Sequence, residues 1–360
     1  MASLITAFLF SLLITFLIIH FRHAHENHTG DLSDSGIQKF HLNTIPRIGG
    51  LGIFIGLIAG ISLRLQSVSL DPIAWLLPLF AFIPFSIGLS EDITKKIGVR
   101  LRLSTVLIAA LLASHYLDLR ISKVDIIGFD YLLAIPVVAI PITLFAITGL
   151  TNAYNIIDGL NGLSSMVGML AASCLAYLGY LLGDAVLLFL SLMLVAAILG
   201  FFIINYPRGL IFLGDGGAYL IGFWIAILSI WLTRQHPEVS PWFVLLINAY
   251  PITETLFTIY RRSIFRKSHA MSADRLHLHS LIYRRILHTS TPKTEMELVN
   301  ANARTAPYLW ILNSVTLVPA LLWWDETAVL VVFFILYCMI YLWLYTRIIS
   351  FRIPKWLSWN

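Results

Sequence analysis

Long apolar runs separated by short polar links recur along the whole chain. A helix needs about 20 mostly apolar residues to cross the hydrocarbon core of a bilayer, and its backbone polar groups must bond to one another there. We therefore predict one transmembrane helix for each run and an all-α integral membrane protein. The eleven predicted helices cover residues 2–21, 48–63, 73–89, 103–117, 131–150, 163–182, 185–204, 216–232, 241–260, 307–323 and 327–346.

The composition supports this interpretation. Hydrophobic residues make up 58% of the chain and charged residues 12%, whereas about 25% of the residues of a soluble domain are charged. No stretch outside the apolar runs is long enough to bury a core of its own, so we expect a single polytopic domain over residues 1–360. The first run lacks a basic start and a small-residue cleavage pattern, which favours a retained helix over a signal peptide.

The positive charges predict the orientation in the membrane. If the links alternate between the two sides, all but four of the 24 Lys and Arg residues fall on one side, and the four exceptions are Arg64, Arg120, Lys123 and Arg234. By the positive-inside rule the basic side is cytoplasmic, so the amino terminus lies outside and the carboxyl terminus in the cytoplasm. We attribute the net charge of +5 to these cytoplasmic links and predict the lipid bilayer, and no nucleic acid, as a partner.

Carboxylate, amide and imidazole side chains gather in the predicted cytoplasmic links. Acidic residues near a membrane are costly unless they are paired, hydrated or bound to a metal, so this gathering predicts a shared site. The first group is Glu91-Asp92, followed by Lys95, at the end of an apolar run. Taken alone, this group also fits a solvated helix end with local ion pairs.

A dense polar segment follows the run that ends at residue 150. It combines amides, a carboxylate and glycines: Asn152, Asn155, Asp158, Gly159, Asn161 and Gly162. The first three recur every three residues and would lie near one face of a helical turn. The glycines let the backbone approach a ligand closely, and Asn161 offers a donor and an acceptor to the edge of a base.

Two further groups complete the pattern. Asp215 lies among glycines in residues 212–217, and Mg²⁺ commonly takes one or two carboxylates together with substrate phosphates. An acidic N-cap is the alternative there. Arg275, His277 and His279 lie close together in the sequence, and anion binding suits them better than zinc, which lacks a convincing third ligand.

These four groups resemble the motifs of the polyprenyl-phosphate N-acetylhexosamine-1-phosphate transferases, glycosyltransferase family 4. Residues 152–163 are similar to the asparagine-aspartate signature, residues 212–216 to the second signature and residues 274–279 to the histidine loop. The resemblance covers about residues 46–285 and is closer to the N-acetylglucosamine branch than to the muramyl-pentapeptide branch. Two positions depart from the family, since Glu91 replaces the usual first aspartate and Ser280 stands where many relatives have another histidine.

The resemblance implies an activity and a location. An N-acetylhexosamine-1-phosphate would pass from a UDP-sugar to undecaprenyl phosphate, releasing UMP and forming a polyprenyl-diphosphate-linked sugar that initiates cell-envelope polysaccharide synthesis. The resemblance also implies ten or eleven helices in the bacterial cytoplasmic (inner) membrane, an active site formed by cytoplasmic loops, and a magnesium ion, with manganese as an alternative. The donor sugar, the pathway and the oligomeric state, including a homodimer, stay open.

Residue roles follow from the motifs and the resemblance together. We expect Asp215 and Asn155 to hold the metal, and Asp92 to position the acceptor phosphate or act as a base. The expected catalytic carboxylates are Glu91, Asp92, Asp158 and Asp215. The expected substrate-binding residues are Asn152, Asn155, Asn161, Gly162, Lys95, Arg102, Arg275, His277 and His279.

Two other functions would also explain the apolar runs. A transporter or flippase for a lipid-linked or anionic solute should place its ionisable groups near the middle of the bilayer. Here these groups cluster at helix ends on one side. An inactive membrane anchor should have lost the carboxylate of the glycine loop, yet Asp215 and Asp158 are both present. We therefore predict the transferase.

Overall fold

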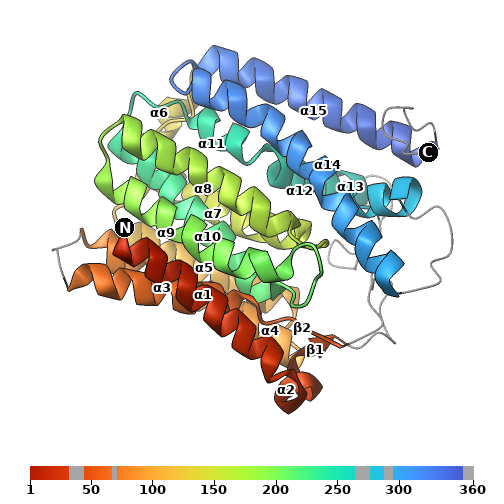
Figure 1. The fold of residues 1–360 in the computed structure, drawn as a ribbon. Helices are drawn as coiled ribbons and strands as arrows, with labels where there is room; N and C mark the ends of the chain where they lie inside the picture. Colours follow the sequence, from red (N-terminus) through yellow and green to blue (C-terminus); the bar gives the residue numbers. More distant parts are fainter. Residues whose placement is uncertain (32–43, 67–70, 264–275, 288–294, 352–360) are drawn as a thin grey trace.

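The computed structural model describes residues 1–31, 44–66, 71–263, 276–287 and 295–351, and helices dominate them (Figure 1). In chain order, the helices up to residue 157 are α1 (Ala2–His20), α2 (Arg22–Thr29), α3 (Gly50–Leu65), α4 (Ile73–Thr94), α5 (Val99–Tyr116), α6 (Phe129–Leu133) and α7 (Pro136–Ile157). Those that follow are α8 (Leu163–Leu181), α9 (Ala185–Asn205), α10 (Gly214–Gln235), α11 (Pro241–Ile247), α12 (Ala249–Arg261), α13 (Leu278–Ile282), the π-helix η3 (Tyr283–Leu287), α14 (Glu295–Leu322) and α15 (Thr327–Ile349). Two short strands, β1 (Gly30–Asp31) and β2 (Ile45–Pro46), pair antiparallel.

Every predicted apolar run lies on a helix or a helix pair, which confirms an all-α, multi-pass membrane architecture. In the described ranges, eight helices are long and apolar enough to cross a membrane, namely α1, α4, α7, α8, α9, α10, α14 and α15, and the bent pair α11–α12 brings the number to nine. Helix α3 is shorter, with 16 residues. Helix α5 begins before its predicted run and takes Arg100 and Arg102 into its first turn.

The predicted single helix at 241–260 is wrong. The segment forms α11 and α12, which meet at an angle of 81°. The break lies at Asn248, whose side-chain oxygen accepts a hydrogen bond from the Tyr154 hydroxyl group at 2.8 Å and whose Nδ2 donates to the carbonyl of Val244 at 3.0 Å. Pro251, in the first turn of α12, has no backbone N–H to offer to a continuous helix.

The stretch between the predicted helices 241–260 and 307–323 also contains more structure than a plain link would. Its described part holds α13 and η3, and α14 begins at Glu295 instead of near residue 307. Periodic apolar residues are sparse in this stretch, so hydropathy alone could not mark it as helical. The early turns of α14 matter for the site, because they carry Asn302.

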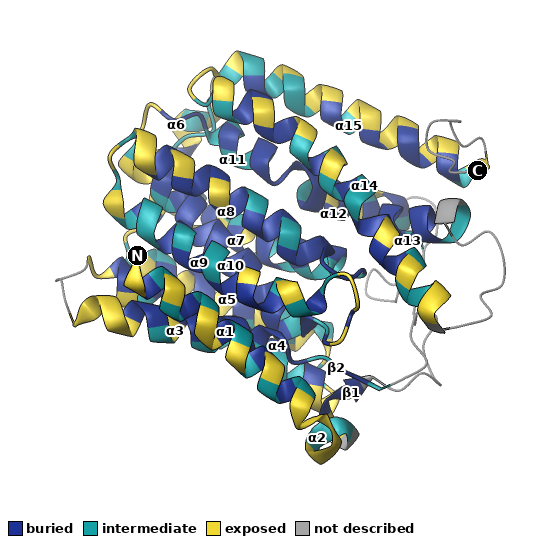
Figure 2. Ribbon diagram, in the orientation of Figure 1, coloured by how far each residue is buried: buried dark blue, intermediate teal, exposed yellow. Residues whose placement is uncertain are grey.

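Helix α10 forms the centre of the bundle and packs against α3, α4, α7, α8 and α9. Of its most apolar 18 residues, 94% are buried, against 22% for α1 and α15. Figure 2 shows the same contrast, with exposed positions along the outer faces of α1, α14 and α15. Large exposed apolar side chains on those faces are what a lipid-facing surface requires, because the surrounding solvent is itself apolar.

The links predicted to lie outside contact one another at one end of the bundle. Arg234 forms an ion pair with Asp118 at 3.0 Å, and His236 lies 3.3 Å from the carboxylate of Asp184. The start of α1 and the end of α15 lie at opposite ends of the bundle (Figure 1). This arrangement agrees with a chain whose two termini are on opposite sides of the membrane.

Candidate active site

The site is built around the first turn of α10, where three helices approach to backbone contact. Gly214 has a φ of +76°, and a Cβ atom there would lie within 3 Å of the Arg47 carbonyl oxygen and of Asp92. A Cβ atom on Gly88 of α4 would meet Gly216 at 2.6 Å, and one on Gly50 of α3 would meet Gly217 at 2.4 Å. The glycines of residues 214–217 are therefore needed for close approach and, at Gly214, for a left-handed backbone.

Asp92 caps α10 from the last turn of α4. Its carboxylate accepts hydrogen bonds from the backbone N–H of Asp215 at 2.9 Å and of Gly216 at 3.0 Å. The side chain is almost fully buried, with 2% of the residue exposed. An acidic acceptor at a helix N-terminus satisfies N–H groups that have no partner in the helix and complements its dipole. Asp92 thus fixes the backbone that carries Asp215.

Asp215 lies between basic and amide side chains from three other segments. Arg102 of α5 contacts one carboxylate oxygen, and Asn155 of α7 donates its Nδ2 to the other at 2.9 Å. Arg47 brings its Nη2 to 3.8 Å from Asp215 and its Nε to 3.9 Å from Asp92. Segments distant in the sequence thus converge on one carboxylate.

Arg47 joins this cluster because its backbone is bound to the α10 loop. The N–H of Phe212 donates to the carbonyl of Pro46, and the N–H of Gly49 donates back to the carbonyl of Phe212. The guanidinium is one third exposed and lies beyond hydrogen-bond distance of both carboxylates. The sequence interpretation did not assign a role to Arg47, although its place beside Gly49-Gly50 was a signal.

Asp158 ends α7 and lies within electrostatic range of Arg47. Desolvation raises the pKa of the Asp158 carboxyl group to about 7, although the positive charge of Arg47 pulls that pKa down. Asn152 lies one turn before Asn155 on the same helix and is partly exposed. The predicted grouping of amides and carboxylate on α7 therefore faces the cluster through Asn155 and Asp158.

Asn161 and Gly162 lie in the turn between α7 and α8, a corner of the chain held by several hydrogen bonds. The N–H of Asn161 donates to Asn302 at 2.9 Å, and the N–H of Gly162 donates to Asn205 at 2.7 Å. The indole of Trp310 donates to the Gly162 carbonyl at 3.2 Å. Asn302 was missed by sequence reasoning, because the polar start of α14 gave no sign of its position.

Glu91 and Lys95 contact the backbone around the end of α4. Glu91 accepts the N–H of Ile97 at 2.6 Å, and Lys95, whose φ is +56°, donates its Nζ to the Gly30 carbonyl at 2.6 Å. These contacts fold the α4–α5 turn and attach it to the β1–β2 ribbon. In this arrangement neither side chain meets Asp215.

The histidine loop reaches the site beside Asp158. A Cβ atom on Gly159 would lie 2.4 Å from Nε2 of His279, so the ring of His279 packs on that glycine. His277 and His279 stack with ring centroids 5.3 Å apart and planes at 8°. Nδ1 of His277 bonds to Glu254, a buried carboxylate on α12 that sequence reasoning also missed. Arg275 lies outside the described residues.

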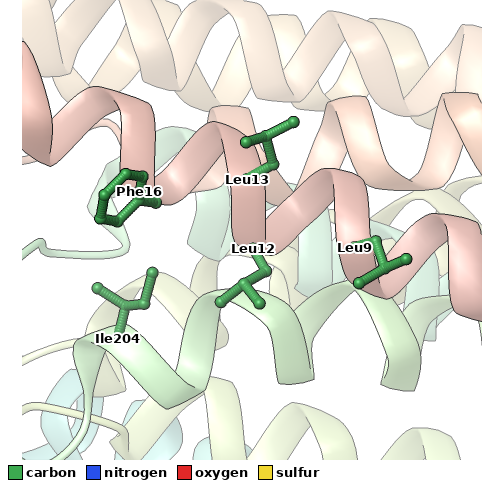
Figure 3. A pocket seen from close by; sticks show the side chains of 5 residues that line it. All are labelled: Leu9, Leu12, Leu13, Phe16 and Ile204. Atoms are coloured by element: carbon green, nitrogen blue, oxygen red, sulfur yellow. The ribbon is translucent and has the colours of Figure 1, made fainter.

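A separate hollow of about 590 Å³ lies between α1 and α9 (Figure 3). Its wall consists of Leu9, Leu12, Leu13, Phe16 and Ile204, with no polar surface. Such a wall can contact hydrocarbon but offers no partner to a phosphate. The cluster around Asp215, by contrast, offers the charged and amide side chains that a phosphate or a cation needs.

Comparison with known proteins agrees with this geometry. Residues 74–233 match the family model described as "Glycosyl transferase family 4". A Bacillus subtilis (strain 168) protein named "Probable undecaprenyl-phosphate N-acetylglucosaminyl 1-phosphate transferase" is 30% identical over 283 residues, covering 78% of this chain and 77% of that protein. The "Undecaprenyl-phosphate alpha-N-acetylglucosaminyl 1-phosphate transferase" of Escherichia coli (strain K12) is 29% identical over 293 residues, covering 78% and 76%. The "Phospho-N-acetylmuramoyl-pentapeptide-transferase" of Lactobacillus johnsonii (strain CNCM I-12250 / La1 / NCC 533) is 28% identical over 268 residues, covering 69% and 80%. With its motifs gathered at one end of an all-α bundle and its similarity extending over most of these relatives, the chain belongs to glycosyl transferase family 4.

Proposed function

We propose that this protein transfers an N-acetylhexosamine-1-phosphate from a UDP-sugar to undecaprenyl phosphate at the bacterial cytoplasmic membrane. The convergence of Asp92, Asn155 and Asp215 with Arg47 and Arg102 is the observation that carries this proposal. Relatives named for both N-acetylglucosamine and N-acetylmuramoyl-pentapeptide donors support the hexosamine class. The lipid product would initiate synthesis of a cell-envelope polysaccharide.

The reaction needs charge neutralisation more than it needs a base. An acceptor phosphate monoester has a second pKa near 6, so much of it is already a dianion at neutral pH. One of its oxygens attacks the sugar-bearing phosphorus, a new P–O bond forms, and the bond to the bridging oxygen breaks as UMP leaves. Arg47 and Arg102 supply the positive charge that reduces repulsion between the two anionic substrates.

The oxygen donors around Asp215 suit a magnesium ion. Among the described residues no group of three or more His, Cys, Asp and Glu side chains could hold a metal. Mg²⁺ does not need such a group, because it commonly takes one or two carboxylates and completes its shell with substrate phosphates and water. Asp215 would hold it together with the side-chain oxygen of Asn155, the residue whose Nδ2 donates to Asp215 at 2.9 Å. Manganese has the same preference for oxygen ligands. When bound, the ion would supply Lewis-acid stabilisation of the transferred phosphate.

The direct test is an assay with purified protein. We expect UMP release and a lipid-linked product when undecaprenyl phosphate, magnesium and a UDP-N-acetylhexosamine are present together. A panel of UDP-sugars, each with and without the acceptor, identifies the donor. UMP release that does not require the acceptor, or no release from any donor, would contradict the proposal.

We also propose that eleven crossings place this cluster on the cytoplasmic side, in a single domain over residues 1–360. The charge distribution supports this orientation, because only four Lys and Arg residues fall in the other set of links. Tags at residue 30 and at the carboxyl terminus should be cytoplasmic, and a tag at Gln235 should be outside. Labelling that puts Asp92 and His277 on opposite sides would rule out a shared site.

A further inference from the structure

Glu254 is a fully buried carboxylate inside an apolar segment. It lies on α12, after the bend at Asn248. A carboxylate in such surroundings is costly unless its oxygens are satisfied, so its presence requires an explanation. The reaction described above assigns it no part.

Three donors converge on the two oxygens of Glu254. His277 Nδ1 lies 2.9 Å from Oε1, and the Tyr341 hydroxyl group lies 2.9 Å from Oε2. The N–H of Leu278 lies 3.2 Å from Oε2. An ionised carboxylate only accepts hydrogen bonds, so this contact assigns a proton to Nδ1 of His277 and leaves Nε2 as its other functional atom.

The same helix holds the loop at a second point. Arg261 donates to the carbonyl of Leu276 at 3.0 Å and to the hydroxyl oxygen of Tyr345 at 2.9 Å. Thr258 lies 3.3 Å from Nδ1 of His277, a longer contact than that of Glu254. Helix α12 therefore holds residues 276–278 by hydrogen bonds to both backbone and side chain.

The orientation of His277 is transmitted to the cluster through ring stacking. His279 lies parallel to His277 and packs on Gly159, the residue after Asp158. A rotation of His277 would displace its stacked neighbour. Glu254 thus acts on the site through two rings without meeting the carboxylates around Asp215.

We propose that Glu254 is a positioning residue for the transferase reaction proposed above. It orients His277 through the bond from Nδ1–H to its carboxylate and docks the histidine loop on α12. As an imidazolium, His277 then donates its Nε2–H to the anionic substrate. This inference rests on the proposed function for its catalytic consequence. The docking itself does not depend on which substrate is used.

A double-mutant cycle tests the catalytic part. In the background His277→Asn, the new side-chain amide can still donate to Glu254, but the Nε2 atom is gone. We expect Glu254→Gln to lower kcat by about tenfold or more in the wild-type background and by less than about twofold in the His277→Asn background. Tyr341→Phe, which leaves the bond to His277 intact, should cost less than Glu254→Gln. Equal losses from Glu254→Gln in the two backgrounds would overturn the proposal.

Hydrogen–deuterium exchange tests the docking without relying on activity. Glu254→Gln should speed exchange in a peptide that contains Leu278, and Tyr341→Phe should speed it less. Unchanged exchange in folded Glu254→Gln would refute the positioning role. Should that variant fail to fold, the same exchange experiment can be made with Glu254→Asp. That variant keeps the negative charge but shortens the side chain by one methylene group, so the carboxylate moves away from His277. A wild-type protein that is inactive with every UDP-sugar would instead refute the proposed function, while the exchange data would still decide the docking.

Discussion

Replacing Asp92 with Asn should loosen the N-terminus of α10. Both oxygens of Asp92 accept backbone N–H groups, from Asp215 at 2.9 Å and from Gly216 at 3.0 Å. An Asn side chain keeps one acceptor oxygen, but its amide nitrogen would face a donor. One of the two N–H groups would therefore lose its partner, and the attraction between the carboxylate and Arg47 would disappear.

The size of the effect follows from these contacts. Loss of an N-cap costs about 0.5–2 kcal/mol, and a buried N–H without a partner costs about 1–3 kcal/mol. If the substitution removes roughly 2–4 kcal/mol of transition-state stabilisation, turnover falls by about 30-fold to about 1000-fold, since about 1.4 kcal/mol is a factor of ten. We expect a loss within this range, centred near about a hundredfold, together with a higher magnesium requirement, because Asp215 loses its fixed position.

The assay is UMP release at saturating acceptor over about pH 6 to 9, with Glu91→Gln as the matched control. Glu91 accepts one N–H, from Ile97, and Gln retains an oxygen for it, so the control should cost clearly less. A capping role predicts a deficit that persists across the pH range. Recovery of the Asp92→Asn rate as pH rises would indicate a base instead. If Glu91→Gln proves the more damaging variant, the two carboxylates have the opposite roles.

Three other substitutions test separate contacts. Asp215→Asn should cost several orders of magnitude in turnover while thermal unfolding stays near that of the wild type, and activity within tenfold of wild type would rule out a principal metal ligand. Gly214→Ala should strongly destabilise the protein, because a φ of +76° costs a side chain about 1–2 kcal/mol and its Cβ would collide with a carbonyl oxygen. Gly98→Ala, with nothing within 4 Å of its Cβ position, is the control, and equal melting temperatures for the two variants would contradict the argument. Gly159→Ala should push away the ring of His279 and lower turnover. Its melting temperature should fall less than that of Gly214→Ala. Unchanged kinetics would contradict the packing of His279 on Gly159.

Hydropathy predicted the long helices well, because most apolar runs come close to the roughly 20 residues that a bilayer crossing requires. It failed at 241–260, where the average apolarity hides a bend set by one side chain, Asn248, and by its bond to Tyr154 on α7. It also failed at the start of α14, whose polar turns pack against the corner at Asn161 instead of against lipid. Both features depend on tertiary partners, which no local pattern contains.

Motif spacing predicted that Asn155, Asp158 and Asp215 belong to one site, and Asn155 and Asp215 are in direct contact. It could not show that Asp92 points at backbone N–H groups, because that depends on how α4 meets α10. Glu254 was within reach of the sequence alone, since a carboxylate inside an apolar run is rare and signals a partner. The partner itself, His277, could be identified only once α12 and the loop were placed together.

The glycines of the motifs bear on how the site is held rigid. Gly50, Gly88 and Gly214 permit backbone contacts among α3, α4 and α10, so the half of the site that carries Asp215 is fixed by close packing. The half that carries the histidines is fixed by hydrogen bonds to Glu254, and the two halves meet where His279 packs on Gly159. Preorganised charge is effective in catalysis because it needs no rearrangement during the reaction. It follows that substitutions of the closely packed glycines should disturb folding and turnover together, whereas substitutions in the hydrogen-bonded half should change turnover with a smaller effect on stability.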